Sequence, residues 1–91
     1  MELGRVIGSV WATKKDEKLN GKKLLLVQQT DADHKPGKKL IVAVDTVGAG
    51  TGDQVLMVLG GSARHALSES GTPVDAAIIA IIDSVVVEKH E

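Results

Sequence analysis

Residues 45–53 read Asp-Thr-Val-Gly-Ala-Gly-Thr-Gly-Asp, and this stretch does most to define the fold of the chain. Its three glycines, Gly48, Gly50 and Gly52, alternate with small residues between two apolar runs rich in β-branched side chains. Such a loop can adopt positive φ angles and lets another backbone approach closely. The spacing is not that of a dinucleotide fingerprint, and the Gly-Lys-Ser/Thr ending of a phosphate-binding P-loop is missing. The stretch therefore predicts a hairpin-like loop or a tight contact point.

The apolar runs on both sides of this loop are rich in Val and Ile, which favours strands. Extended segments are expected at 1–13, 23–29, 40–45, 54–59 and 76–87, with an exposed loop at 31–39 around Pro36-Gly37. One short helix is expected at 62–67, with Ser62 as its N-cap. The chain has five expected strands and one expected helix, without the alternation of strands and helices that marks βαβ units. This pattern predicts an all-β protein, a small closed or nearly closed β-barrel.

The composition predicts one small domain over residues 1–91 with a modest core. The chain has no cysteine and no zinc-ligand cluster, so oligomerisation is the remaining common way to stabilise it. The opening residues do not resemble a secretory signal, and the longest apolar stretch is too short to span a bilayer. A soluble cytoplasmic protein without cofactor is expected.

Nucleic acid is not an expected partner. The formal net charge is −1, whereas a nucleic-acid binder needs a basic face. Trp11 is the only aromatic residue, so almost nothing could stack on bases.

Three groups of polar residues could carry chemistry, but each has a simpler explanation. Asp45 and Asp53 flank the glycine loop and are expected to cap backbone N–H groups rather than to act as an acid–base pair. Adjacent residues on a helix diverge, so Ser62, Arg64 and His65 are expected to serve as helix cap and subunit contacts rather than as a triad. The histidines do not have zinc-ligand spacing from one another; they are His34, His65 and His90.

Two further features concern surfaces. A lone tryptophan usually fills a gap in a core or an interface, and the small core favours a subunit interface for Trp11. The charged run at 14–18 is expected to be a solvated loop, although contacts with neighbouring proteins remain an alternative. Arg64 could pair across a subunit boundary with Asp75 or Glu69.

Several motifs, taken together and in order, resemble the vertex proteins of bacterial microcompartments, the EutN/CcmL family. Together they cover nearly the whole chain. They are Gly4-Arg5-Val6-Ile7-Gly8-Ser9-Val10-Trp11, Leu19-Asn20-Gly21-Lys22, Val42 to Asp53, Gly60-Gly61-Ser62-Ala63-Arg64, Pro73-Val74-Asp75-Ala76-Ala77-Ile78 and Ile81-Ile82-Asp83.

The resemblance implies a five-stranded OB-like barrel assembled as a homopentamer. Such rings fill the corners of an icosahedral shell beside hexameric shell proteins, have no catalytic activity, and have also been considered as pores. It further implies an axial position for the loop of Gly48, Ala49, Gly50, Thr51 and Gly52. The candidate residues for the subunit interface are Trp11, Asp53, Ser62 and Arg64.

The alternative function is an OB-fold module that binds nucleic acid or a small ligand, because a fold does not dictate a function. A small enzyme or ligand carrier would use Asp53 and His65 and would need a cavity with converging polar groups. The sequence contains no motif for it.

Overall fold

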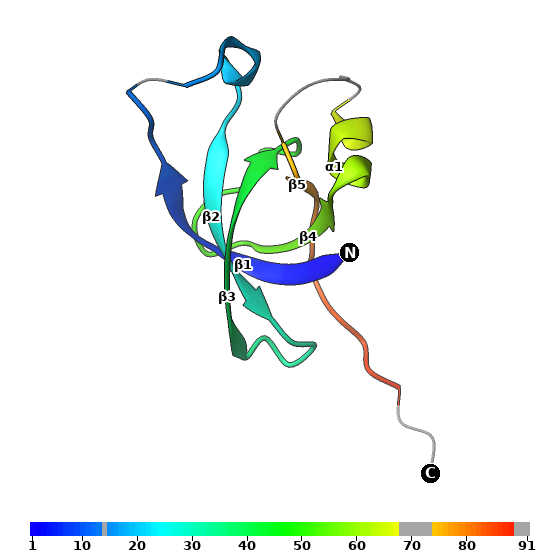
Figure 1. Ribbon diagram of the computed structural model, residues 1–91. Helices are drawn as coiled ribbons and strands as arrows, with labels where there is room; N and C mark the ends of the chain where they lie inside the picture. The colour runs from blue at the N-terminus through cyan, green and yellow to red at the C-terminus, as the bar shows by residue number, and fades with distance from the viewer. Residues whose placement is uncertain (14, 68–73, 89–91) are drawn as a thin grey trace.

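The computed structural model describes residues 1–13, 15–67 and 74–88, which form a small β-barrel with one helix (Figure 1). In chain order the elements are β1 (Glu2–Val10), η1 (Glu17–Leu19), β2 (Leu24–Thr30), β3 (Pro36–Asp45), β4 (Gln54–Leu59), α1 (Gly61–Ala66) and β5 (Ala76–Ile81). The prediction of a five-stranded OB-like barrel with one short helix is confirmed.

The strands close into a barrel in the order β1-β2-β3-β5-β4. All neighbouring pairs are antiparallel except β3 and β5, which run parallel. This parallel seam is short, because it consists of Val44 opposite Ala77 and Asp45 opposite Ile78. The glycine loop leaves β3 immediately after the seam, so the closure of the barrel positions the loop.

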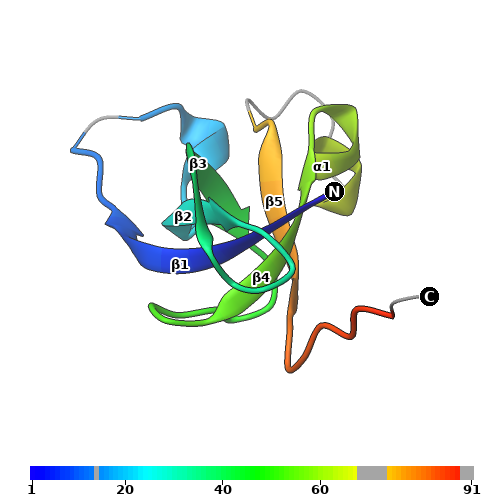
Figure 2. The ribbon, with the colours of Figure 1, turned by 90° about the horizontal axis from the view of Figure 1, so that it is seen from below.

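Successive side chains of a strand point to opposite faces of the sheet, so the apolar side chains form two clusters, one inside the barrel and one outside it. The inner cluster comprises Val6, Leu25, Val27, Ala43, Ala49, Val55, Met57, Ala76 and Ile78, all almost fully buried. The outer cluster lies where α1 packs against β4 and β5 (Figure 2), and it comprises Val44, Val58, Ala63, Val74 and Ala77. The helix therefore covers only part of the barrel surface.

Several boundaries predicted from the sequence are wrong: β1 ends at Val10 rather than at residue 13, and three further errors follow. β3 begins at Pro36, inside the expected loop, because a proline is tolerated as the first residue of a strand and Pro36 lies opposite Thr30. β5 ends at Ile81, although a strand was expected to residue 87. The pairing with β4 ends at Val55 opposite Ile81, and one further bond, from Ile82 N to Gln54 O at 2.8 Å, closes the ladder.

The third error concerns the start of α1. The N-cap is Gly60 at φ 62°, and no side chain caps the helix, so Ser62 lies inside the first turn. Gly60 also donates its N–H to Asp75 O at 2.7 Å, which ties the start of the helix to the residue before β5. A positive φ and a backbone contact favour glycine there over serine.

Gly4 provides a stability prediction. A Cβ at Gly4 would lie 2.9 Å from Gln28 O and 3.1 Å from Met57 Cε, inside the packed barrel. We expect Gly4→Ala to destabilise the fold by about 1–3 kcal/mol through overpacking. The measurement is the urea midpoint at fixed protein concentration. Gly8→Ala on the same strand is the matched control, since a Cβ there meets nothing within 4 Å. Equal midpoints for the two variants would contradict the prediction.

Candidate functional site

The glycine loop between β3 and β4 is a defined structure with its own buried anchor. Gly48 and Gly52 have φ angles of 80° and 96°, which L side chains rarely adopt. Ala49 lies between them and is fully buried in the inner cluster. These two glycines are thus required by the backbone of a single chain.

Gly50 differs from its two neighbours. Its φ is not in the positive range, and a Cβ on it would meet only Asp53 Oδ2 at an ordinary 4.0 Å. Nothing among the described residues therefore requires glycine at position 50. If glycine is required at this half-buried position, the requirement comes from another protein chain that packs against it.

Carboxylates hold both ends of the loop. Asp45 Oδ1 accepts the N–H of Val47 at 3.0 Å, and Asp53 Oδ2 accepts the N–H of Gly50 at 2.8 Å. The prediction that these aspartates cap backbone N–H groups is confirmed. Asp53, a candidate for the subunit interface, is half-buried and already bonded to its own loop.

Lys23 supports the loop, a role that the sequence did not indicate. Its Nζ donates to Ala49 O at 2.7 Å and lies 3.9 Å from Asp45 Oδ2, whose side chain is buried. The register of β2 against β3 brings Lys23 beside the loop, and Asp45 N also bonds to Lys23 O at 3.0 Å. An ordinary lysine after a turn carries no sequence signal for this role.

Hydrogen bonds to β1 and β5 complete the support of the loop. Gly52 N donates to Val6 O at 2.8 Å, and Val6 N donates to Asp53 O at 3.0 Å. On the other side Thr46 Oγ1 donates to Ile78 O at 2.7 Å. The loop is therefore fixed to two strands, while Thr51 and Gly52 remain exposed.

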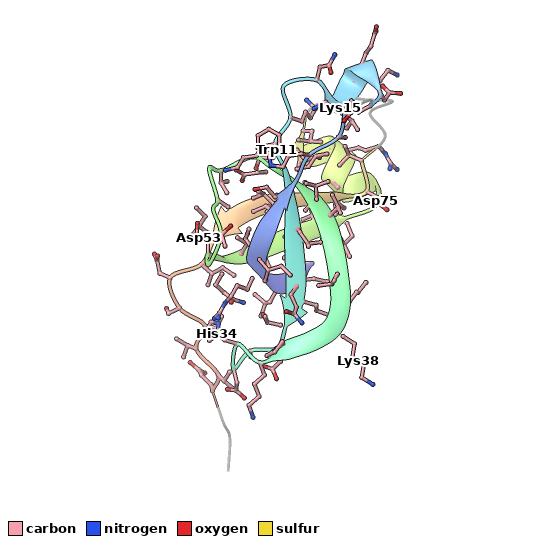
Figure 3. All side chains as sticks on the ribbon, turned by 90° about the vertical axis from the view of Figure 1, so that its left-hand side faces the viewer. Trp11, Lys15, His34, Lys38, Asp53 and Asp75 are labelled. Carbon is pink, nitrogen blue, oxygen red and sulfur yellow. The ribbon has the colours of Figure 1, made fainter. Side chains whose placement is uncertain are left out.

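Trp11 is 93% exposed, so it does not fill the core of its own chain. It lies just beyond the end of β1, near Lys15 (Figure 3). Both residues line a hollow of about 310 Å³, whose lining also includes Lys22 and Lys23. Exposing an indole to water loses the apolar burial that such a side chain normally contributes. This is compatible with the expected interface position.

The α1 residues do not assemble into a catalytic group. Ser62 and His65 are exposed, and Arg64 Nη1 donates to Val74 O at 3.2 Å, which ties α1 to the segment before β5. Asp75, the expected partner of Arg64, is exposed, whereas Glu69 lies outside the described residues.

The histidines are scattered. His34 sits on the exposed turn between β2 and β3 at φ 64°, His65 lies on α1, and His90 lies outside the described residues. Across the described ranges, no group of three or more His, Cys, Asp or Glu side chains could hold a metal ion.

Comparison with known proteins agrees with this geometry. The family model for ethanolamine utilisation protein EutN/carboxysome matches residues 1–83. The chain belongs to the EutN/CcmL family of microcompartment shell vertex proteins. The shell vertex protein PduN of Salmonella typhimurium is 46% identical over 88 residues, covering 92% of this chain and 97% of the relative. The shell vertex protein GrpN of Rhodospirillum rubrum is 44% identical over 85 residues, covering 93% and 96%.

Solved structures of this family share the fold. The GrpN pentameric microcompartment shell protein of Rhodospirillum rubrum superposes with a TM-score of 0.87 at 43% identity, covering 98% of this chain and all of that one. CcmL of Gloeobacter violaceus superposes with a TM-score of 0.90 at 41% identity, covering 97% and 91%. The protein is thus a structural component of a bacterial microcompartment shell and not an enzyme. Within the described residues, no helix combines the length and apolarity needed to cross a membrane.

Lys23 allows a test of how the loop is held. We expect Lys23→Met to lower the free energy of unfolding by about 1 kcal/mol, because a charge-assisted bond is lost at a half-exposed position. Amide exchange at Gly50 and Gly52 should become faster, since their loop loses one anchor. Lys35→Met, on the exposed turn before β3, is the control and should change neither quantity. Unchanged exchange in the loop of Lys23→Met would show that Lys23 does not support it.

Proposed function

We propose that five copies of this chain form a closed ring that occupies a corner of a microcompartment shell and contacts hexameric shell proteins around it. The observation that supports this best is the superposition over nearly the whole chain on a pentameric shell protein. A head-to-tail interface closes into a ring when each rotation returns to the first copy. Flat hexagonal sheets cannot close by themselves, so five-fold units supply the curvature.

The surface of the single chain supports assembly. Large apolar side chains lie exposed on several elements: Ile7, Trp11, Leu40, Val42, Val47, Ile81, Val86 and Val87. A 91-residue chain has few residues for its own core, so burial between copies adds stability at about 25 cal/mol per Å² before association costs. The surfaces that would contact a neighbouring copy include Trp11, Ser62 and Arg64. Asp53 would contribute indirectly, by holding the loop that it caps.

The loop of Gly48, Ala49, Gly50, Thr51 and Gly52 is proposed to lie at or beside the five-fold axis. Its rigid support by β1, β5 and Lys23 suits a position where five copies converge. The glycine at position 50, which the single chain does not require, suits close approach of a second backbone.

Native mass spectrometry of the purified protein tests the ring. We expect a dominant species at five times the 9.5 kDa mass of one chain. Its fraction should rise with protein concentration by mass action. A strict monomer at micromolar concentration would contradict the proposed function.

A substitution at Gly50 tests the axial position of the loop. We expect Gly50→Leu to leave the circular dichroism of the barrel unchanged and to abolish the five-chain species, because five bulky side chains would clash near the axis. Asp33→Leu adds the same side chain on the exposed turn between β2 and β3, and it should assemble normally. Normal assembly of Gly50→Leu would place the loop away from the axis.

A further inference from the structure

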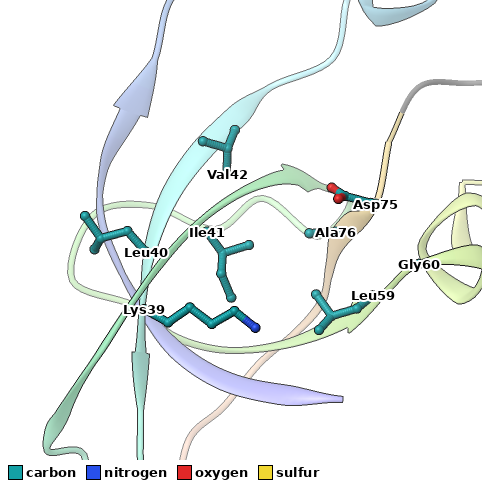
Figure 4. A pocket seen from close by; sticks show the side chains of 8 residues that line it. All are labelled: Lys39, Leu40, Ile41, Val42, Leu59, Gly60, Asp75 and Ala76. Carbon is teal, nitrogen blue, oxygen red and sulfur yellow. The ribbon is translucent and has the colours of Figure 1, made fainter.

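The barrel wall contains a slot beside the parallel seam. It has a volume of about 440 Å³ and opens between β3 and the junction of β4 with β5 (Figure 4). Its lining comprises Lys39, Leu40, Ile41, Val42, Leu59, Gly60, Asp75 and Ala76. Ile41 and Leu59 pack against the inner cluster, so the slot exposes the edge of the core.

One wall of the slot is an open strand edge. β3 pairs with β2 from Pro36 to Val44, but on its other side the ladder to β5 begins only at Val44. Among the described residues, the edge of β3 from residue 36 to 43 has no strand partner on this side. Such an edge is a template for pairing with another segment. Lys38 adds positive charge at one end of it, whereas Lys39 Nζ is paired with Glu2 Oε1 at 3.1 Å. Leu40 and Val42 remain exposed and apolar.

The described residues also include an extended segment after β5 that belongs to no strand and is tied to β4 only by the bond from Ile82 N to Gln54 O. Residues 82–88, here called the tail, read Ile-Asp-Ser-Val-Val-Val-Glu and run away from the barrel after β5 (Figure 1). Within it Val86 is 80% exposed and Val87 is 54% exposed. The three consecutive valines favour a strand, and Asp83 and Glu88 supply negative charge.

We infer that the tail of one copy adds as a strand to the open edge of β3 in the next copy and covers the slot. This inference rests on the proposed ring, whose head-to-tail interface it assigns to two named surfaces. The valines would cover Leu40, Val42 and the exposed core edge, and main-chain bonds would satisfy the edge of β3. One carboxylate of the tail, that of Asp83 or Glu88 according to the strand direction, complements the exposed Lys38.

The tail of the same chain is poorly placed to fill this slot. Ala76, at the start of β5, lines the slot, whereas the tail leaves from the far end of β5 and continues away from it (Figures 1 and 4). To return, the tail would have to reverse direction, yet it contains neither glycine nor proline. Fully extended it reaches about 20 Å, which compares with the two shorter extents of the molecule, 24 and 22 Å. It can therefore cross the face of a neighbour.

Cysteine cross-linking tests the placement, because the natural chain has no cysteine. Chains carrying Leu40→Cys and chains carrying Val86→Cys are unfolded, mixed and refolded together, then oxidised and run on a non-reducing gel. Each variant refolded alone gives the background. We expect covalent dimers only in the mixture, since a paired strand brings Cβ atoms within about 5.5 Å. Glu17→Cys mixed with Val86→Cys is the matched control and should give background only.

A second measurement separates this inference from the proposed function. Removing residues 82–91 should raise the concentration at half-assembly of the pentamer by at least about tenfold, because the buried valines are lost. The barrel should keep its circular dichroism. Assembly at the full-length concentration, or a pentamer whose mixed cysteine variants give no dimers, would overturn the inference and leave the ring intact. A full-length chain that never forms the pentamer would overturn the ring itself, and the inference with it.

Discussion

Closure of the barrel by a very short parallel seam is the constraint on which the rest of the structure depends. Two residue pairs, Val44 with Ala77 and Asp45 with Ile78, join the ends of the sheet. Because the seam is short, it needs support, and that support comes from the glycine loop. Thr46 bonds to Ile78, and Lys23 contacts both Asp45 and the loop carbonyl of Ala49. The loop and the seam are therefore one structural unit.

The same short seam explains why the chain exposes apolar surface. A longer ladder between β3 and β5 would have covered Leu40, Ile41 and Val42 within the chain. Instead the wall opens beside these residues, and α1 packs mainly against β4 and β5. A small domain with an open edge and a modest core is stabilised by association, since burial between copies compensates for what the single chain leaves exposed. The structure and the family both indicate a protein that functions in an assembly.

The sequence predicted the architecture because strand patterning and turn residues are local signals. Val- and Ile-rich runs located the five strands, and the aspartates beside the glycines behaved as loop caps. Strand ends were less predictable, because they depend on the partner strand. β3 starts at Pro36 because Thr30 lies opposite, and β5 stops where β4 offers no further partner. The helix N-cap was missed because Gly60 is tied to Asp75, a contact across fifteen residues.

The candidate site was predictable only in part, for the same reason. Gly48 and Gly52 are explained by their backbone angles, which a glycine-rich sequence suggests. Lys23 could not be found, because its role arises from the register between β2 and β3. Trp11 and Gly50 remain without an explanation inside one chain: an indole is left in water, and a glycine stands where the backbone does not need one. When contacts within one chain do not explain a residue, we infer that it lies on a surface that a neighbouring chain covers. A homo-oligomer supplies such a neighbour to every chain, and in a head-to-tail interface two different surfaces of the same sequence meet.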